Sequence, residues 1–179
     1  MTPLVEALVR GAGLGAIADA RAAGRVPDDA ALAPLEGCDL LALGACADAA
    51  RRLELSDEVR VWVPAPPTAA PGTLVFDASV HDRGTALLRR VAYARLAGPL
   101  GQRIVLDWSA LGLEICQVAL GFGASDLAGP IASRRGLPLL DADGAKGQIK
   151  RREIAGYVER AGFRPVFVTL KPVEALRTA

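Results

Sequence analysis

Short apolar segments that alternate with helical segments constrain the fold of this chain more than any other feature. The clearest is "QRIVLDWS" (102–109), an apolar run of strand length, and in "EVRVWV" (58–63) valines alternate with Arg60 and Trp62. The other candidate strands are 73–79, 125–129 and 164–170. Helical patterns at 83–98, 111–123 and 148–162 separate strands in the second half. Strands separated by helices favour parallel pairing and an α/β fold.

Four or five strands are too few for a closed eight-stranded barrel, which takes about 250 residues. The prediction is therefore a partial (β/α) barrel, or a small open and mostly parallel sheet of four to five strands flanked by helices. The first part of the chain is helical, at 3–10, 13–23 and 39–54. In the third of these helices, the residues expected to supply most of the buried stripe are Leu40, Leu41, Leu43, Ala47 and Leu53.

The 179 residues are predicted to form a single domain. Its parts are the N-terminal helices (1–57), two strands with a Pro-rich linker at 64–72 (58–79), and the β/α units (80–179).

Charge and cysteine content exclude several classes of protein. The formal net charge is only +1, so no global field attracts nucleic acid or an anionic membrane. Three cysteines, an odd number, argue against a disulfide framework and for a reducing compartment. The sequence shows no signal peptide and no apolar run of about 20 residues. We therefore expect a cytoplasmic protein that binds neither nucleic acid nor membrane.

Candidate site residues come from the rule that functional side chains gather at the carboxyl ends of parallel strands. They are Asp77, Ser79 and His81 after the second strand, Asp107, Trp108 and Ser109 after the third, Ser125 and Asp126 after a helix, and Thr169 and Lys171 at the last strand. This polar set could line one opening at the carboxyl edge of the sheet, its mouth. The expected ligand contacts are Asp77, Asp107, Trp108, Ser109, Ser125 and Asp126.

The two candidates for a catalytic role are His81 and Asp107. His81 is the only histidine, and its unperturbed pKa lies near neutrality. A Ser109–His81–Asp107 triad can be written, but no nucleophile motif supports it. The simpler interpretation is that "SVHD" caps the following helix, with Asp82 as the N-cap. Asp107 could equally pair with an arginine, and Trp108 could lie in the core instead of stacking on a ligand.

No metal site is predicted, because one histidine and three scattered cysteines do not form a tetrahedral set. "DADG" (141–144) lacks the ligands of a calcium loop. Cys116 is expected to be a small core residue. The basic run "KGQIKRRE" (146–153) indicates either an anion site or a solvated helix face whose charge Glu153 offsets, and we favour the latter.

Two blocks of the chain resemble the radical S-adenosylmethionine enzymes of the futalosine route to menaquinone. These are aminofutalosine synthase and cyclic dehypoxanthinyl futalosine synthase, with the deazaflavin-forming FO synthase similar to them. The first block, 37–63, contains "CDLLALGACADAARRLE" and is similar to the family's opening helix and first strand. The second, 82–170, contains "LGFGASDLAGP" and is similar to the last helices and strands of the family barrel. The resemblance implies a shortened relative of that barrel.

The departures from the family pattern concern its cofactor. The family carries a C-x3-C-x2-C loop after its first strand, and its thiolates hold a [4Fe–4S] cluster. Here that place is taken by "VPAPPTAAPGT", which contains no cysteine. In the late turn, Ser125 stands where the family usually has Asp or Asn, and Pro130 stands where it has Thr. Of the residues that the family has in this turn, only Asp126 and Gly129 remain. We therefore expect no cluster, no other cofactor and no radical catalysis.

Three functions stay open at this point. The first is a non-catalytic protein that binds a small, nucleoside-like ligand or a futalosine-pathway enzyme. The second is a small cluster-free hydrolase or lyase acting on a nucleoside-like compound, and the third is a structural or regulatory protein without a small ligand. A shortened barrel exposes sheet edges, so we expect a homodimer or a complex with a family enzyme.

Overall fold

The structure is a computed structural model that describes residues 2–63, 72–77, 80, 82–132 and 149–169. Its helices are α1 (Pro3–Gly11), α2 (Gly15–Ala22), α3 (Asp29–Leu32), the 3₁₀ helix η1 (Ala33–Glu36), α4 (Leu40–Leu55), α5 (Gly84–Ala97), α6 (Trp108–Leu111), α7 (Leu113–Leu120) and α8 (Arg151–Arg160). Its strands are β1 (Glu58–Val63), β2 (Thr73–Phe76), β3 (Arg103–Asp107), β4 (Asp126–Ala128), β5 (Ile131–Ala132), β6 (Ile149–Lys150) and β7 (Arg164–Thr169).

Five of the described strands form one open sheet in the order β2-β3-β4-β1-β7. Every pair in it is parallel, with Arg60 opposite both Asp126 and Val166, and Leu106 opposite Leu127. β5 and β6 form a separate two-stranded sheet. The predicted α/β fold with a small open parallel sheet is confirmed. The Pro-rich stretch expected at 64–72 lies, except for Gly72, outside the described residues.

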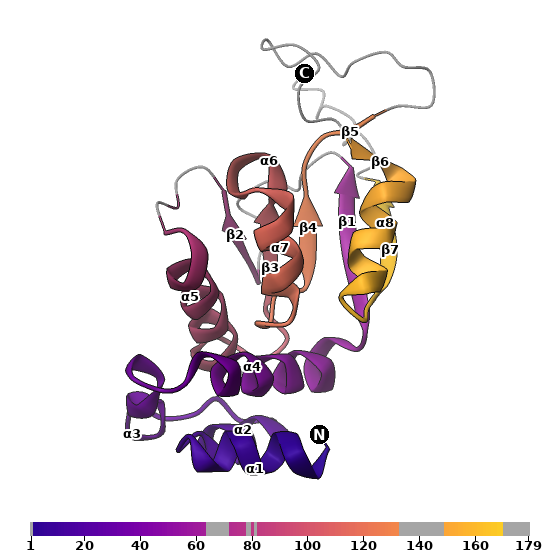
Figure 1. The fold of residues 1–179 in the computed structure, drawn as a ribbon. Helices are drawn as coiled ribbons and strands as arrows, with labels where there is room; N and C mark the ends of the chain where they lie inside the picture. The colour runs from indigo at the N-terminus through magenta and orange to yellow at the C-terminus, as the bar shows by residue number, and fades with distance from the viewer. Residues whose placement is uncertain (1, 64–71, 78–79, 81, 133–148, 170–179) are drawn as a thin grey trace, which may run out of the picture.

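The two faces of the sheet differ because alternate side chains point to opposite sides. Val59, Val61, Ile104, Leu106 and Leu127 are almost fully buried and belong to the hydrophobic core. Helices α5, α7 and α8 lie on this side of the strands (Figure 1). The opposite face carries Arg60, Trp62, Arg103, Asp107 and Asp126 among its polar and aromatic side chains, together with the buried Val105 and Ala128.

The edge strand β7 tolerates a proline for a geometric reason. The backbone N–H of Arg164 donates to the carbonyl of Asp57, toward the sheet (2.9 Å). The next residue, Pro165, therefore faces the open side of β7, where no ladder hydrogen bond to β1 is lost. Proline at this position also removes one unpaired donor from the exposed edge.

Helix α4 crosses the amino-terminal edge of the sheet, and α1 and α2 pack below it (Figure 1). The Asp39 side chain begins the helix by accepting from the N–H of Ala42 (2.9 Å). The predicted buried stripe of α4 is partly wrong: Leu43 is 1% exposed and Ala47 is buried, but Leu41 is 72% and Leu53 67% exposed. The core face instead contains Ala42, Gly44, Cys46, Ala50 and Arg51.

Small residues on that face allow close packing. A Cβ added at Gly44 would lie 2.9 Å from the ring of Phe122, so a larger residue there would force this ring to move. One hydrophobic cluster extends from Val9 in α1 to Phe163 next to β7. Over the described ranges, no helix combines the length and apolarity needed to cross a bilayer.

Candidate functional site

Asp107 and Ser109 lie at the carboxyl end of β3, where the sequence placed a site. Asp107 Oδ1 accepts hydrogen bonds from the Ser109 N–H (2.8 Å) and the Ser109 hydroxyl (2.6 Å). The side chain thereby caps α6 as its N-cap residue. Asp107 is half-buried and Ser109 exposed, and none of the described residues donates to Asp107 Oδ2. One carboxylate oxygen is therefore available for a ligand at this edge.

Trp108, between these two residues, is 5% exposed. Its indole Nε1–H is buried and finds no acceptor within the described part of the chain. The ring lies against Gly129, just after β4, where an added Cβ would be 2.3–2.7 Å from ring atoms that include Nε1. A buried indole N–H normally has a hydrogen-bond partner, so this one is an unused donor, on a ring that belongs to the hydrophobic core.

The candidates after β2 are only partly described. Asp77 directly follows the strand, and its carbonyl accepts from the N–H of Val80 (3.0 Å). Ser79 and His81 lie outside the described residues, as do Lys171 and the 141–144 turn. The predicted Asp82 N-cap is wrong: helix α5 begins after Arg83 without a side-chain cap, and Asp82 pairs with Arg90 Nη1 (2.8 Å).

Ser125 and Asp126 do not lie at the mouth formed by Asp107 and Ser109. Asp126 begins β4 and is opposite Val105, two residues before the pair formed by Asp107 and Ala128. Parallel strands bring their carboxyl ends together, whereas the turn after α7 delivers these two residues to the amino end of β4. The expectation that all the polar candidates line one mouth is wrong for this reason.

Asp126 is fully buried, and protein donors occupy both of its oxygens. Oδ1 accepts from Trp62 Nε1 (2.9 Å) and Arg103 Nη2 (3.2 Å). Oδ2 pairs with Arg103 Nε (3.0 Å) and accepts from the Ser125 hydroxyl. Burial lowers the pKa of Arg103, and the charge of Asp126 opposes this shift. The contacts join β4 to β1 and β3, which is a structural role; a ligand contact by Asp126 stays a prediction.

A buried ionic cluster below the sheet was not predicted. Glu54 of α4 pairs with Arg21 Nη1 (3.2 Å) and Arg95 Nη1 (3.3 Å), and it also accepts from the N–H of Gly101 (2.8 Å). Arg21 donates further to the carbonyls of Arg95, Leu96 and Gly98 at the end of α5. Burial lowers the pKa of Arg21 and brings that of Arg95 to about 10, and Glu54 opposes both shifts.

Arg51 forms a second buried set of contacts. Its guanidinium donates to the carbonyls of Ala124 (3.1 Å), Ser56 (2.7 Å) and Glu58 (2.7 Å). It thereby joins the end of α4, the start of β1 and the turn before β4. Helical spacing is the sequence signal that could have predicted the burial of Arg51, because this residue continues the buried stripe of Leu43 and Ala47 at intervals of four residues.

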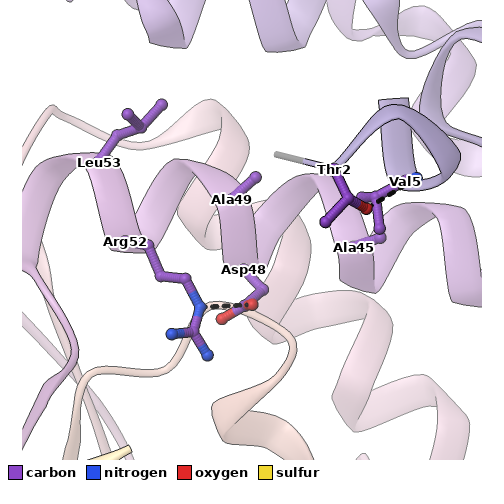
Figure 2. A pocket seen from close by; sticks show the side chains of 7 residues that line it. All are labelled: Thr2, Val5, Ala45, Asp48, Ala49, Arg52 and Leu53. Carbon is purple, nitrogen blue, oxygen red and sulfur yellow. Dashed lines mark hydrogen bonds and ion pairs between the residues drawn. The ribbon is translucent and has the colours of Figure 1, made fainter. Parts of the chain in front are cut away.

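Two cavities open beside the helices of the described chain. A groove of about 370 Å³ lies between the first turn of α1 and α4 (Figure 2). It is lined by Thr2, Val5, Ala45, Asp48, Ala49, Arg52 and Leu53. A smaller cavity of about 230 Å³ is lined by Leu35, Glu36, Leu43, Arg89, Arg90 and Tyr93. No sequence pattern pointed to either cavity, because each is formed by elements distant in the chain.

The three cysteines are buried free thiols on α4, α7 and the turn before α4. Burial raises the pKa of Cys46 and of Cys116 to about 12. Cys116 is 0% exposed, and its predicted core position is confirmed. Within the described ranges, no three His, Cys, Asp or Glu side chains are grouped closely enough to hold a metal ion.

The basic run at 146–153 is described from Ile149 onward. Glu153 accepts from the backbone N–H of Lys150 at the start of α8 (3.0 Å), as a capping-box residue does. The Arg151 guanidinium lies over the Phe167 ring, 4.0 Å from its centroid. Lys150, Arg151 and Arg152 are exposed. These contacts favour a solvated helix face, although Lys146 lies outside the described residues.

Comparison with known proteins adds no relative to this description. The chain matches no protein-family model, and no curated protein matches its sequence. The resemblance to the futalosine-pathway enzymes therefore depends only on the residues of the two blocks, 37–63 and 82–170.

Proposed function

We propose that this protein is a non-catalytic binding protein for a small nucleoside-like ligand, which it holds at the carboxyl edge of the sheet next to β3. The observation that carries the proposal is the pair of unused groups at this edge. Trp108 Nε1–H is a buried donor without an acceptor, and Asp107 Oδ2 is an acceptor without a donor among the described residues. Open parallel sheets bind their ligands at this edge.

A donor and an acceptor contributed by two consecutive residues suit a planar amide or a nucleobase edge, which presents the complementary pair. Ser109 is exposed beside them and can bind a ligand hydroxyl group. The indole N–H is buried, so binding requires a small movement of the residues next to Gly129. The resemblance to enzymes that act on futalosine-type nucleosides points to the same class of ligand.

The absence of radical chemistry is part of the same proposal. An iron–sulfur cluster needs thiolates, and burial raises the pKa of Cys46 and Cys116 well above neutrality. Both side chains also belong to one packed hydrophobic core. These observations support a protein that binds without a cluster. We propose a cytoplasmic homodimer, or a complex with a futalosine-pathway enzyme, because β2 and β7 are edges of the described sheet.

Thermal unfolding with added futalosine-type nucleosides tests the proposal. At a ligand concentration of 100 Kd, binding stabilises a protein by about 2.7 kcal/mol, which is a Tm rise of roughly 5–10 °C at this chain length. Trp108→Phe removes the N–H, and Asp107→Asn replaces the free acceptor while keeping a capping oxygen. Both variants should lose most of the shift. Asp19→Asn, an exposed carboxylate on α2, is the control and should retain it.

Gly129→Ala offers an independent check, because the new methyl group would collide with the indole ring. We expect it to lower the stability of the free protein by about 1–3 kcal/mol and to abolish ligand binding. If no nucleoside at millimolar concentration shifts the Tm of the wild type, the proposed function is wrong. Turnover of the nucleoside would favour the cluster-free enzyme, and a stable complex without a ligand shift would favour a purely structural role.

A further inference from the structure

β7 is the longer of the two free edges of the described sheet, with six residues against four in β2. It pairs with β1 on one side only, and Arg164 donates inward to this side. Because successive residues of a strand alternate in direction, the N–H and carbonyl groups of Phe167 and Thr169 point outward. Pro165 offers only its carbonyl there. No described strand pairs with this side, so the later half of β7 is open to a further strand.

Helix α8 presents a stripe of three residues beside this open edge. The Arg151 guanidinium lies over the ring of Phe167 on β7, 4.0 Å from its centroid. Ala155 lies one helical turn beyond Arg151 on the same side, and Glu159 lies one turn beyond Ala155. Arg152, seven residues before Glu159, shares this side of the helix. These three residues, Arg152, Ala155 and Glu159, form the outer stripe of α8.

The other sides of α8 are in contact with the rest of the protomer. Ile154 and Val158 are fully buried in the hydrophobic core. The Gln117 side chain of α7 donates to the backbone carbonyl of Tyr157 (3.0 Å). Figure 1 shows α8 at the end of the helical layer, with α7 on one side of it and no labelled helix beyond it. The outer stripe is therefore turned away from α7, above the open edge of β7.

The two charges of the outer stripe are opposite in sign and lie at its two ends. Arg152 and Glu159 are exposed, and neither has an ion-pair partner in the described part of the chain. The other charged side chains of this helix have contacts within the protomer, and these are Arg151, Glu153 and Arg160. A twofold axis exchanges the two ends of the stripe, so a second copy brings each charge opposite its complement.

We propose that a second copy of this chain covers the open edge of β7 and the outer stripe of α8. The interface rests on the homodimer of the proposed function and does not involve its nucleoside site. The two β7 strands pair antiparallel and join two sheets into one, and the two α8 helices lie side by side. Ala155 is small enough for these helices to approach to about 8–10 Å. Arg152 then binds Glu159 of the partner subunit, twice in each dimer.

Sedimentation of the full chain over a range of concentrations tests the interface. The wild type should dimerise, and Arg152→Glu or Glu159→Arg should weaken the dimer about tenfold or more, because like charges then face each other. The double variant with both substitutions restores opposite charges and should recover the dimer. Arg160→Glu reverses a charge on another side of the same helix and should leave the dimer unchanged. Circular dichroism checks that each variant is folded.

A cysteine at the closest approach of the helices provides a second measurement. Ala155→Cys should form a disulfide-linked dimer on mild oxidation, whereas Arg160→Cys should not; the native thiols are buried. A wild type that stays monomeric, a dimer unaffected by both charge reversals, or no recovery in the double variant overturns the proposal. So does association with another protein only. A monomer whose Tm still rises with a nucleoside would refute this interface and leave the nucleoside site intact.

Discussion

At the scale of single residues, buried charge determines where the helices and strands join. Glu54 is shared by Arg21 and Arg95, and the side chains of all three residues are at most 8% exposed. Removing one partner of a buried ion pair leaves an uncompensated charge, which costs far more than the pair itself contributes. Glu58 and Arg164 form a pair of the same chemistry at the surface, where solvent screens it.

Glu54→Gln should therefore lower the free energy of unfolding by about 3–5 kcal/mol, since two buried guanidinium groups lose the carboxylate that they share. Glu58→Gln is the matched control and should change it by less than about 1 kcal/mol. Urea denaturation followed by circular dichroism measures both values. Equal effects of the two substitutions would show that the Glu54 cluster is solvated in the folded protein.

At the scale of elements, α4 packs against the helices α1, α2 and α5. One face packs into the core under the sheet, Arg51 binds three carbonyl groups of neighbouring segments, and the outer face carries Leu41 and Leu53 in solvent. α1 and α2 pack against the same helix. The helix is therefore held by its position between two layers, not by a simple stripe of large apolar residues.

A pair of leucine substitutions checks this assignment of the faces of α4. Leu43→Ala should reduce the free energy of unfolding by about 2–5 kcal/mol, because it opens a cavity in the core. Leu41→Ala, two residues earlier, should change it by no more than about 0.5 kcal/mol. Both values follow from urea or thermal unfolding. A large loss in Leu41→Ala would mean that a partner or another part of the chain covers that face.

At the scale of the whole molecule, one continuous core extends from the N-terminal helices to the last described strand. Cys38, Cys46 and Cys116 all belong to it, although Cys116 lies far from the other two in the sequence. A single cooperative core unfolds as one unit, so distant groups should become accessible together. The thiols therefore report on the cooperativity of the fold.

We expect the three thiols to resist a thiol-reactive chromogenic disulfide at pH 8 and to react together across the urea transition. Burial raises the pKa of Cys46 and Cys116 from 9.0 to about 12, so the folded state holds more protons than the unfolded state between these values. Their contribution to stability is complete below pH 9 and is lost as the pH rises toward 12. Reaction of one thiol before the loss of helical signal would indicate separate folding units.

Much of the local structure could be predicted from residue patterns. The alternation in "EVRVWV" and the apolar run "RIVLD" form strands, and the intervening helices lie close to their predicted limits. The short elements α3, α6, β5 and β6 were not predicted, because a few residues carry little periodicity. The error at Leu41 and Leu53 has a different cause: hydrophobicity shows which residues favour burial, but a helix that packs closely against its neighbours buries small residues of its own, such as Ala42 and Gly44.

The sequence by itself determined the α/β class, the parallel pairing and the core position of Cys116, because all three depend on local periodicity and on the composition of single segments. Only the tertiary structure decided the strand order, the separation of Asp126 from Asp107, the shared Glu54 and the α1–α4 groove. Each of these depends on which distant segments meet. Contacts between distant segments depend on the packing of the whole core and on the pairing of buried charges, which no short stretch of sequence specifies.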